Sequence, residues 1–128
     1  MGRQSRKIKI ELENATADSV KKLVTDITAD LIEQTPVETG WARANWIPGL
    51  DQPEGTEPVG DETSVDEGAQ QQGIAEIITG YTIDKDAFIF NNVPYIERLN
   101  DGQSPQAPAG FVDSIIEKRV SEANERKI

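Results

Sequence analysis

The chain contains no cysteine and no histidine. Without cysteine it has no disulfide, no thiolate metal site and no cysteine nucleophile. Without histidine it lacks the commonest general base and a frequent zinc ligand, so serine-type triads and zinc hydrolysis are disfavoured. It also contains no P-loop, no dinucleotide-binding glycine pattern and no calcium loop. We therefore expect no enzymatic activity, no cofactor and no bound metal.

Aromatic residues make up only 5% of the chain and hydrophobic residues 36%. The 128 residues fit one domain spanning 1–128 with a modest core, so we expect self-assembly or a partner to contribute to stability. No apolar run is long enough to cross a membrane, and the polar, basic residues 1–9 contain no signal-peptide core. These features predict a soluble protein without a membrane partner.

Positive charge is scarce as well. Thirteen Lys and Arg stand against 23 Asp and Glu, which leaves a formal net charge of −10. A chain this acidic is repelled by nucleic-acid phosphates and by anionic membranes. We therefore expect no specific DNA binding.

The first half of the chain predicts two strands around one long helix. Residues 7–13 alternate apolar and charged side chains, which is typical of a half-buried strand. A helix capped by Asn14 or Thr16 follows, with apolar residues on one face, and it ends near Gln34 because Pro36 cannot continue it. Residues 44–50 predict a short second strand.

Residues 51–67 carry seven acids and no base, and prolines and glycines interrupt them. This composition predicts a mobile, solvated loop. A sharper hypothesis is that the loop lines a channel that DNA passes through, because carboxylates repel phosphates. The candidate channel-lining residues are Asp51, Glu54, Glu57, Asp61 and Glu62.

The second half predicts a short helix over 66–79 ended by Gly80, a buried strand over 87–90 and a brief helix after Pro94. Residues 103–109 predict an extended loop because they contain Pro105 and Pro108. A last helix begins near 109, exposes Lys118 and Arg119 to solvent, and frays over 121–128. Together these elements predict an α+β domain, with a small mixed or antiparallel sheet packed against two main helices.

Two segments on either side of the acidic loop carry more specific information. Residues 35–46 read TPVETGWARANW, and residues 88–112 read FIFNNVPYIERLNDGQSPQAPAGFV. Together they resemble the head–tail joining, or tail-completion, proteins of long-tailed double-stranded DNA phages, which include relatives of the minor tail protein Z of phage lambda. The match covers about residues 27–120. Glu38 replaces a frequent Asp of the family, and Asn100-Asp101 replaces an acid followed by an aromatic or His.

The resemblance implies a virion structural protein that completes the tail and joins it to the head as a ring around the DNA channel. The implied partners are further copies of itself, in a hexamer or dodecamer, head connector or stopper proteins, and the tail terminator or tube. The implied location is the virion, with the host cytoplasm during assembly. A tail terminator ring is a close alternative that the motifs leave open.

The motifs also supply candidate assembly residues, although the favoured interpretation is that the whole 35–46 turn is scaffold. Arg43 either pairs with an acid on a neighbouring subunit or is solvated. The exposed side of the amino-terminal strand is a second candidate, because it can extend a neighbour's sheet. The predicted interface residues are Trp41, Arg43, Trp46, Tyr95, Arg98, Pro105, Pro108 and Phe111.

Two rival functions belong to other classes. The first is an acidic DNA mimic that inhibits a DNA-binding enzyme, although a mimic needs a rigid array of acids and here most lie beside bases or in one loop. The second is a hydrolase with a carboxylate pair, but no acid lies in a recognised catalytic motif. The acids considered for such a pair are Glu33, Glu38, Glu76 and Glu97.

Overall fold

A three-stranded antiparallel sheet, in the strand order β1-β3-β2, forms the centre of the fold. β1 spans Arg6–Ile10, β2 spans Ile47–Leu50 and β3 spans Ala87–Asn91. This computed structural model describes residues 6–36, 40–50, 57–102 and 109–126. The α+β class is confirmed, and the sheet is antiparallel throughout its described strands.

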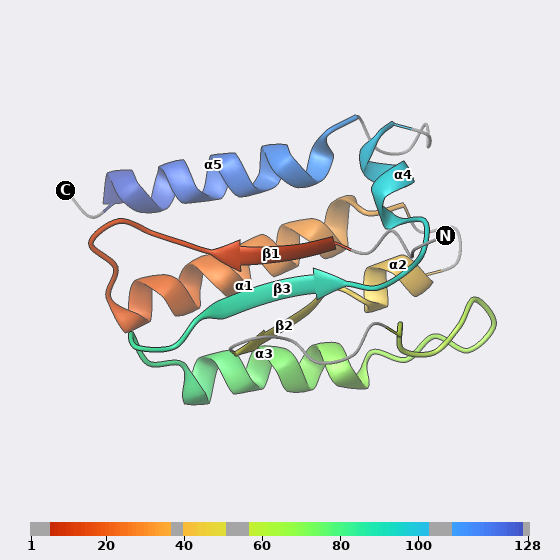
Figure 1. Ribbon diagram of the computed structural model, residues 1–128, viewed down its shortest axis with the longest axis horizontal. Coiled ribbons are helices and arrows are strands. Elements are labelled where there is room, and N and C mark those ends of the chain that lie inside the picture. The colour runs from red at the N-terminus through yellow and green to blue at the C-terminus, as the bar shows by residue number, and fades with distance from the viewer. Residues whose placement is uncertain (1–5, 37–39, 51–56, 103–108, 127–128) are drawn as a thin grey trace.

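Helices cover one face and both sides of this sheet (Figure 1). α1 (Ala17–Gln34) lies behind it, α3 (Gly68–Gly80) runs along β2, and α5 (Phe111–Arg126) runs on the β1 side and packs on α1. The short helices α2 (Trp41–Ala44) and α4 (Ile96–Asn100) lie together at one end.

The core forms between α1 and the sheet because both have an apolar face there. α1 starts at a capping box, in which the Ser19 amide donates to Thr16 Oγ1 (3.1 Å) and the Thr16 amide donates to Ser19 Oγ (2.9 Å). Its apolar side chains recur every three or four residues and are almost completely buried against Ile8 and Ile89 of the sheet. The buried apolar residues of α1 are Val20, Leu23, Val24, Ile27 and Leu31.

Gly73 lets α3 lie directly against the edge strand β2. A Cβ atom at this position would sit 2.2 Å from the carbonyl oxygen of Pro48, a distance that real atoms do not tolerate. The missing side chain of Gly73 therefore permits a close contact between helix and strand at this edge. α3 therefore covers the β2 edge of the sheet.

We expect Gly73→Ala to destabilise the protein by about 2 kcal/mol, because the added methyl forces α3 away from Pro48. Urea unfolding at neutral pH measures this. Gly80→Ala is the matched control, since a Cβ there lies at 3.4 Å from the Leu50 side chain. Equal stability of the two variants would contradict the tight approach.

Arg119 joins α5 to α1. Its guanidinium donates to both carboxylate oxygens of Asp30, and one of these hydrogen bonds is 3.0 Å long. The hydrogen bond from Arg119 lowers the pKa of Asp30 below its usual value. Only 28% of the Arg119 side chain is exposed, so the prediction that it faces solvent is wrong.

We expect Asp30→Asn to lower the free energy of unfolding by about 1 kcal/mol at pH 7. Because the folded pKa of Asp30 lies below the unfolded value, its contribution is present above about pH 4 and is lost as the pH falls further. Denaturant unfolding of wild type and variant between pH 7 and 3 tests this. Glu62→Gln, at an exposed site, is the control. If the difference in unfolding free energy between wild type and Asp30→Asn does not shrink in acid, Asp30 does not make the predicted pH-dependent contribution.

Several predicted boundaries differ from the structure. The first strand ends at Ile10 rather than Glu13, and the second begins at Ile47 because residues 41–44 form α2. α3 includes Gly80 and ends before Tyr81. α5 continues to Arg126 where the sequence predicted fraying beyond Ser121, because Ala123 is buried, with 3% of its surface exposed.

Candidate assembly surface

The turn that follows α1 is held by hydrogen bonds to the last carbonyls of that helix. The Thr35 hydroxyl donates to the Leu31 carbonyl (2.6 Å) and accepts from the indole of Trp46 (2.8 Å). The Arg43 guanidinium donates to the carbonyls of Thr35 (2.7 Å) and Glu33 (2.8 Å). A cation is favourable at this end of a helix. Arg43 therefore bonds within its own chain, whereas the sequence suggested either an ion pair with a neighbouring subunit or a solvated side chain.

Asn45 fixes the acidic segment to this turn. Its side-chain amide donates to the carbonyls of Trp41 (2.9 Å) and Val59 (3.0 Å), and its side-chain oxygen accepts from the Val59 amide (2.7 Å). The indole of Trp41 also donates to the Val59 carbonyl (3.1 Å). The acidic segment therefore passes directly beside Trp41.

Two further buried amides tie the turn to the rest of the molecule. Gln70 of α3 donates to the carbonyls of Arg43 (2.8 Å) and Trp46 (3.0 Å). Asn91 at the end of β3 donates to the carbonyl of Ala42 (2.9 Å) and accepts from the Val93 amide (3.0 Å). The sequence patterns did not single out Gln70, because nothing in helical periodicity marks a buried glutamine as a partner of a distant turn.

Trp41 and Tyr95 meet at the surface where the two motif segments join. Their ring centroids are 5.9 Å apart and their planes cross at 63°, an edge-to-face contact. Both side chains are half-buried, and Arg98 nearby on α4 is exposed. These three predicted interface residues therefore keep some surface exposed to solvent.

Two other predicted interface residues are not on the surface. Trp46 is 0% exposed and Phe111 is 1% exposed, and both belong to the chain's own core. An interface role for either side chain is therefore corrected, because neither presents area to a neighbour. Pro105 and Pro108 lie outside the described residues.

The junction of α4 and α5 uses Asn100, one of the residues that depart from the family pattern. Its side chain accepts from the Val112 amide (2.9 Å) and donates to Asp113 (3.1 Å). Arg6 of β1 donates to Asp113 and to Glu97 (3.3 Å). The hydrogen bond from Arg6 lowers the pKa of Asp113 below its usual value. The start of β1 is thus attached to both α4 and α5.

The described part of the acidic segment contains a defined turn. One carboxylate oxygen of Asp61 accepts from the amides of Thr63 and Ser64 and from the Thr63 hydroxyl, each at 2.8 Å. These bonds lower the pKa of Asp61, with the Thr63 hydroxyl making the largest contribution. Glu57, Asp61 and Glu62 are exposed, whereas Asp51 and Glu54 lie outside the described residues.

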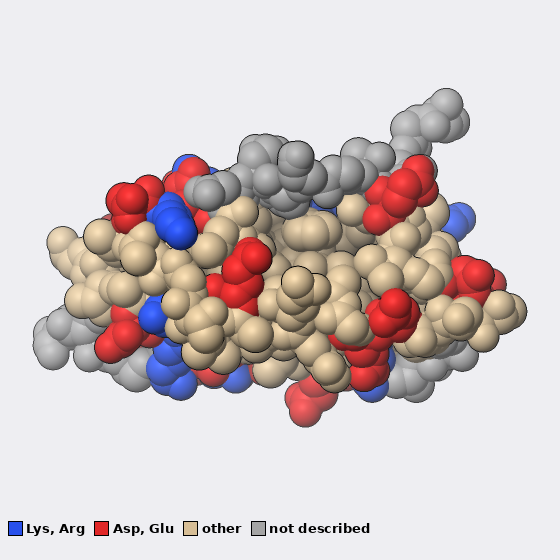
Figure 2. Space-filling view, turned by 90° about the horizontal axis from the view of Figure 1, so that it is seen from below, with Lys and Arg blue, Asp and Glu red and all other residues tan. Residues whose placement is uncertain are grey.

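The exposed residues of the two motifs and the acidic turn gather at one end of the molecule. We call this region the motif end and define it as α2, Tyr95 with the helix α4 that follows it, and residues 57–65 (Figure 1). On the α3 side, acids form separate patches on a largely uncharged surface (Figure 2). Glu76 is the only charged residue of α3. The motif end therefore combines aromatic surface, a base and several acids.

The described residues show no other chemical centre. No group of three potential metal-ligating side chains occurs among them, and no described helix is long and apolar enough to cross a bilayer. A scan against protein-family models, a search of curated proteins and a search of solved structures each found no match.

We expect Gln70→Ala to destabilise the protein by about 2 kcal/mol, because it leaves two carbonyls of the turn without their partner. Gln72→Ala is the matched control, since Gln72 is exposed on the same helix and should change stability by less than about 0.5 kcal/mol. Denaturant unfolding measures both variants. A loss no larger for Gln70 than for Gln72 would mean that these bonds do not stabilise the turn.

Proposed function

We propose that this chain is a non-enzymatic virion structural protein of the phage neck. In this proposal it completes the tail and joins it to the head as a ring around the DNA channel. Its partners are further copies of itself, in a hexamer or dodecamer, the head connector or stopper proteins, and the tail terminator or tube. It acts at the head–tail interface of the virion after assembly in the host cytoplasm.

The observation that supports this proposal is the meeting of the two motif segments. Asn91 donates to the Ala42 carbonyl, and the ring of Tyr95 packs against Trp41. Segments 49 residues apart in the chain thus meet, as expected if both take part in one assembly contact. The tail terminator role draws on the same motifs and is the nearest alternative.

The motif end is the proposed contact with a neighbour or with the tail. Ring subunits make head-to-tail contacts, so each needs two different patches. Trp41 and Tyr95 supply aromatic area, which is enriched in interfaces, and Arg98 supplies an exposed base. The exposed acids Asp61 and Glu62 belong to the same motif end, where they would keep an adjacent channel repulsive to DNA.

The pairing of acids disfavours the rival DNA mimic. Asp26, Asp30 and Glu122 each lie within 4 Å of Arg119, and Glu97 and Asp113 are paired with Arg6. A mimic would instead present uncompensated carboxylates at phosphate-like spacing. Competition with DNA for a DNA-binding enzyme distinguishes the two functions.

The decisive experiment combines light scattering with tail joining. We expect the purified protein to form a ring, or to remain a monomer that joins purified tails lacking a head. Arg98→Glu should weaken joining by roughly tenfold, because it reverses a charge at the motif end. Lys118→Glu, an equal charge change at an exposed site on α5, is the control and should join normally.

A protein that remains monomeric and does not join purified tails would overturn the proposal. Displacement of DNA from an enzyme by such monomers would favour the mimic. Equal loss of joining in both charge variants would mean that overall charge, rather than the motif end, controls the contact.

A further inference from the structure

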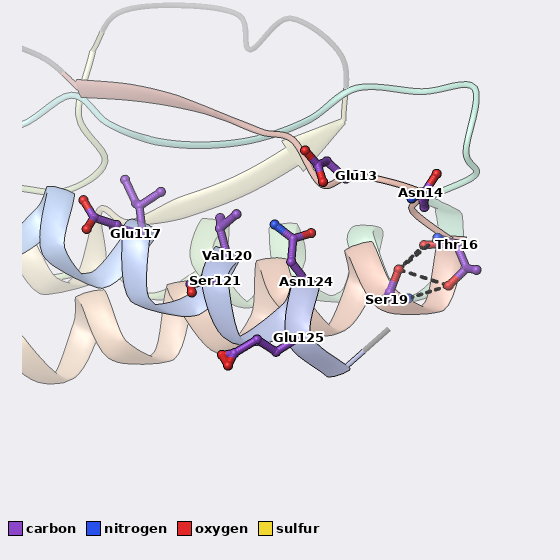
Figure 3. A pocket seen from close by; sticks show the side chains of 10 residues that line it. Glu13, Asn14, Thr16, Ser19, Glu117, Val120, Ser121, Asn124 and Glu125 are labelled. Atoms are coloured by element: carbon purple, nitrogen blue, oxygen red, sulfur yellow. Dashed lines mark hydrogen bonds between the residues drawn. The ribbon is translucent and has the colours of Figure 1, made fainter. Parts of the chain in front are cut away.

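An open groove of about 1120 Å³ lies between the second half of α5 and the connection from β1 to α1 (Figure 3). Ile116 and Val120 supply its apolar surface. Glu13 and Asn14 form the opposite wall, and the side chains of Val120 and Asn124 point toward it in the close view. The lining residues are Glu13, Asn14, Thr16, Ser19, Ile116, Glu117, Val120, Ser121, Asn124 and Glu125.

The groove exists because the two edges of the sheet are covered differently. α3 seals the β2 edge through Gly73, whereas α5 packs mainly on α1. Arg6 holds β1 to the first turn of α5 through Asp113, but no comparable described contact closes the space beside Glu13. Within the described residues, β1 pairs with β3 alone. The β1 side of the molecule therefore keeps room for an added segment.

The chemistry of the groove favours a cationic occupant. Glu13, Glu117 and Glu125 line it, and no Lys or Arg does. The N-terminal amides of α1 do not attract an anion here, because Thr16 and Ser19 already cap each other. The combination of apolar floor and acidic walls suits an extended segment that carries positive charge.

We propose that residues 1–5 of a neighbouring copy occupy this groove. Residues 1–5 contain one base, Arg3, and no acid, in a chain whose net charge is −10. Arg6 is bonded to Glu97 of α4, so β1 begins beside the motif end, whereas the groove lies along the far half of α5. The contact is therefore head-to-tail, and it supplies the second patch that the proposed ring needs. In this respect the inference rests on the proposed function.

The length of the groove matches that of a five-residue extended segment. From Ile116 to Glu125 the groove follows α5 for about 14 Å, at a rise of about 1.5 Å per residue. Five extended residues span about 17 Å. A segment of five residues therefore covers the groove, with Arg3 near its middle.

The absence of cysteine makes a direct test possible. Gln4→Cys and Asn124→Cys introduced together should form an intermolecular disulfide on mild oxidation of the full chain. A non-reducing gel should then show a ladder of dimers, trimers and larger species. Gln4→Cys combined with Thr79→Cys is the control, because Thr79 is exposed on α3 and away from the groove.

A second variant tests the charge argument in the same background. Glu117→Lys with Glu125→Lys should slow ladder formation by roughly tenfold. Glu67→Lys with Glu76→Lys makes the same change in net charge at exposed sites outside both the groove and the motif end, and should leave the rate unchanged. Adding Arg3→Glu to the Glu117→Lys and Glu125→Lys variant should restore most of the rate, because the two charges are exchanged.

Absence of a ladder, or an equal ladder with the Thr79→Cys control, would overturn the inference. A disulfide formed within one chain, seen as a monomer of altered mobility, would also overturn it, since the occupant would be the chain's own segment. Tail joining by the wild-type protein is measured separately. A negative disulfide test would therefore reject the groove contact without by itself rejecting the proposed neck function.

Discussion

Buried side-chain amides hold the turn between α1 and β2, and the arrangement of the molecule depends on their hydrogen bonds. Asn45, Gln70 and Asn91 together satisfy main-chain groups from Trp41 to Trp46 and at Val59. An unpaired buried carbonyl costs about 1–3 kcal/mol, so this turn has little freedom to adopt another path. Because the partners come from α3 and β3, the same bonds fix both elements relative to α1.

This constraint explains how a chain with few aromatic residues places them. Trp46 is the largest fully buried side chain, and its indole nitrogen bonds to Thr35 at the end of α1. Trp41, five residues earlier, remains half-buried against Tyr95. One tryptophan is therefore enclosed in the core, and the other remains partly exposed at the motif end.

The two edges of the sheet show how a small difference in packing creates a possible interface. Gly73 allows α3 to approach β2 closely and cover that edge. α5 instead follows α1, to which Arg119 and Asp30 attach it, so a groove remains beside β1. Unpaired edges readily accept an added strand or segment, and proteins normally cover them or use them. The acidic walls of the groove favour a basic occupant over another acidic surface.

The sequence by itself determined the elements whose signals are local. The three- and four-residue spacing of apolar residues marked α1, the alternation of residues 7–13 marked β1, and the apolar run of residues 87–90 marked β3. The α+β class followed from their order. The motifs also brought Trp41 and Tyr95 forward as surface candidates, although they equally suggested Trp46 and Phe111, which are buried.

Only the tertiary structure decided which polar groups meet, because those contacts join residues far apart in the chain. The Gln70 bond to Arg43 spans 27 positions and the Asn91 bond to Ala42 spans 49, and no periodic pattern encodes a pairing over such distances. Arg119 was misread, and the role of Gly73 was not predicted, for the same reason: a surface charge or a missing side chain has meaning only against the partner that packs on it. Local periodicity reports which face of an element is apolar, whereas the neighbour that covers that face is chosen by the packing of the whole chain.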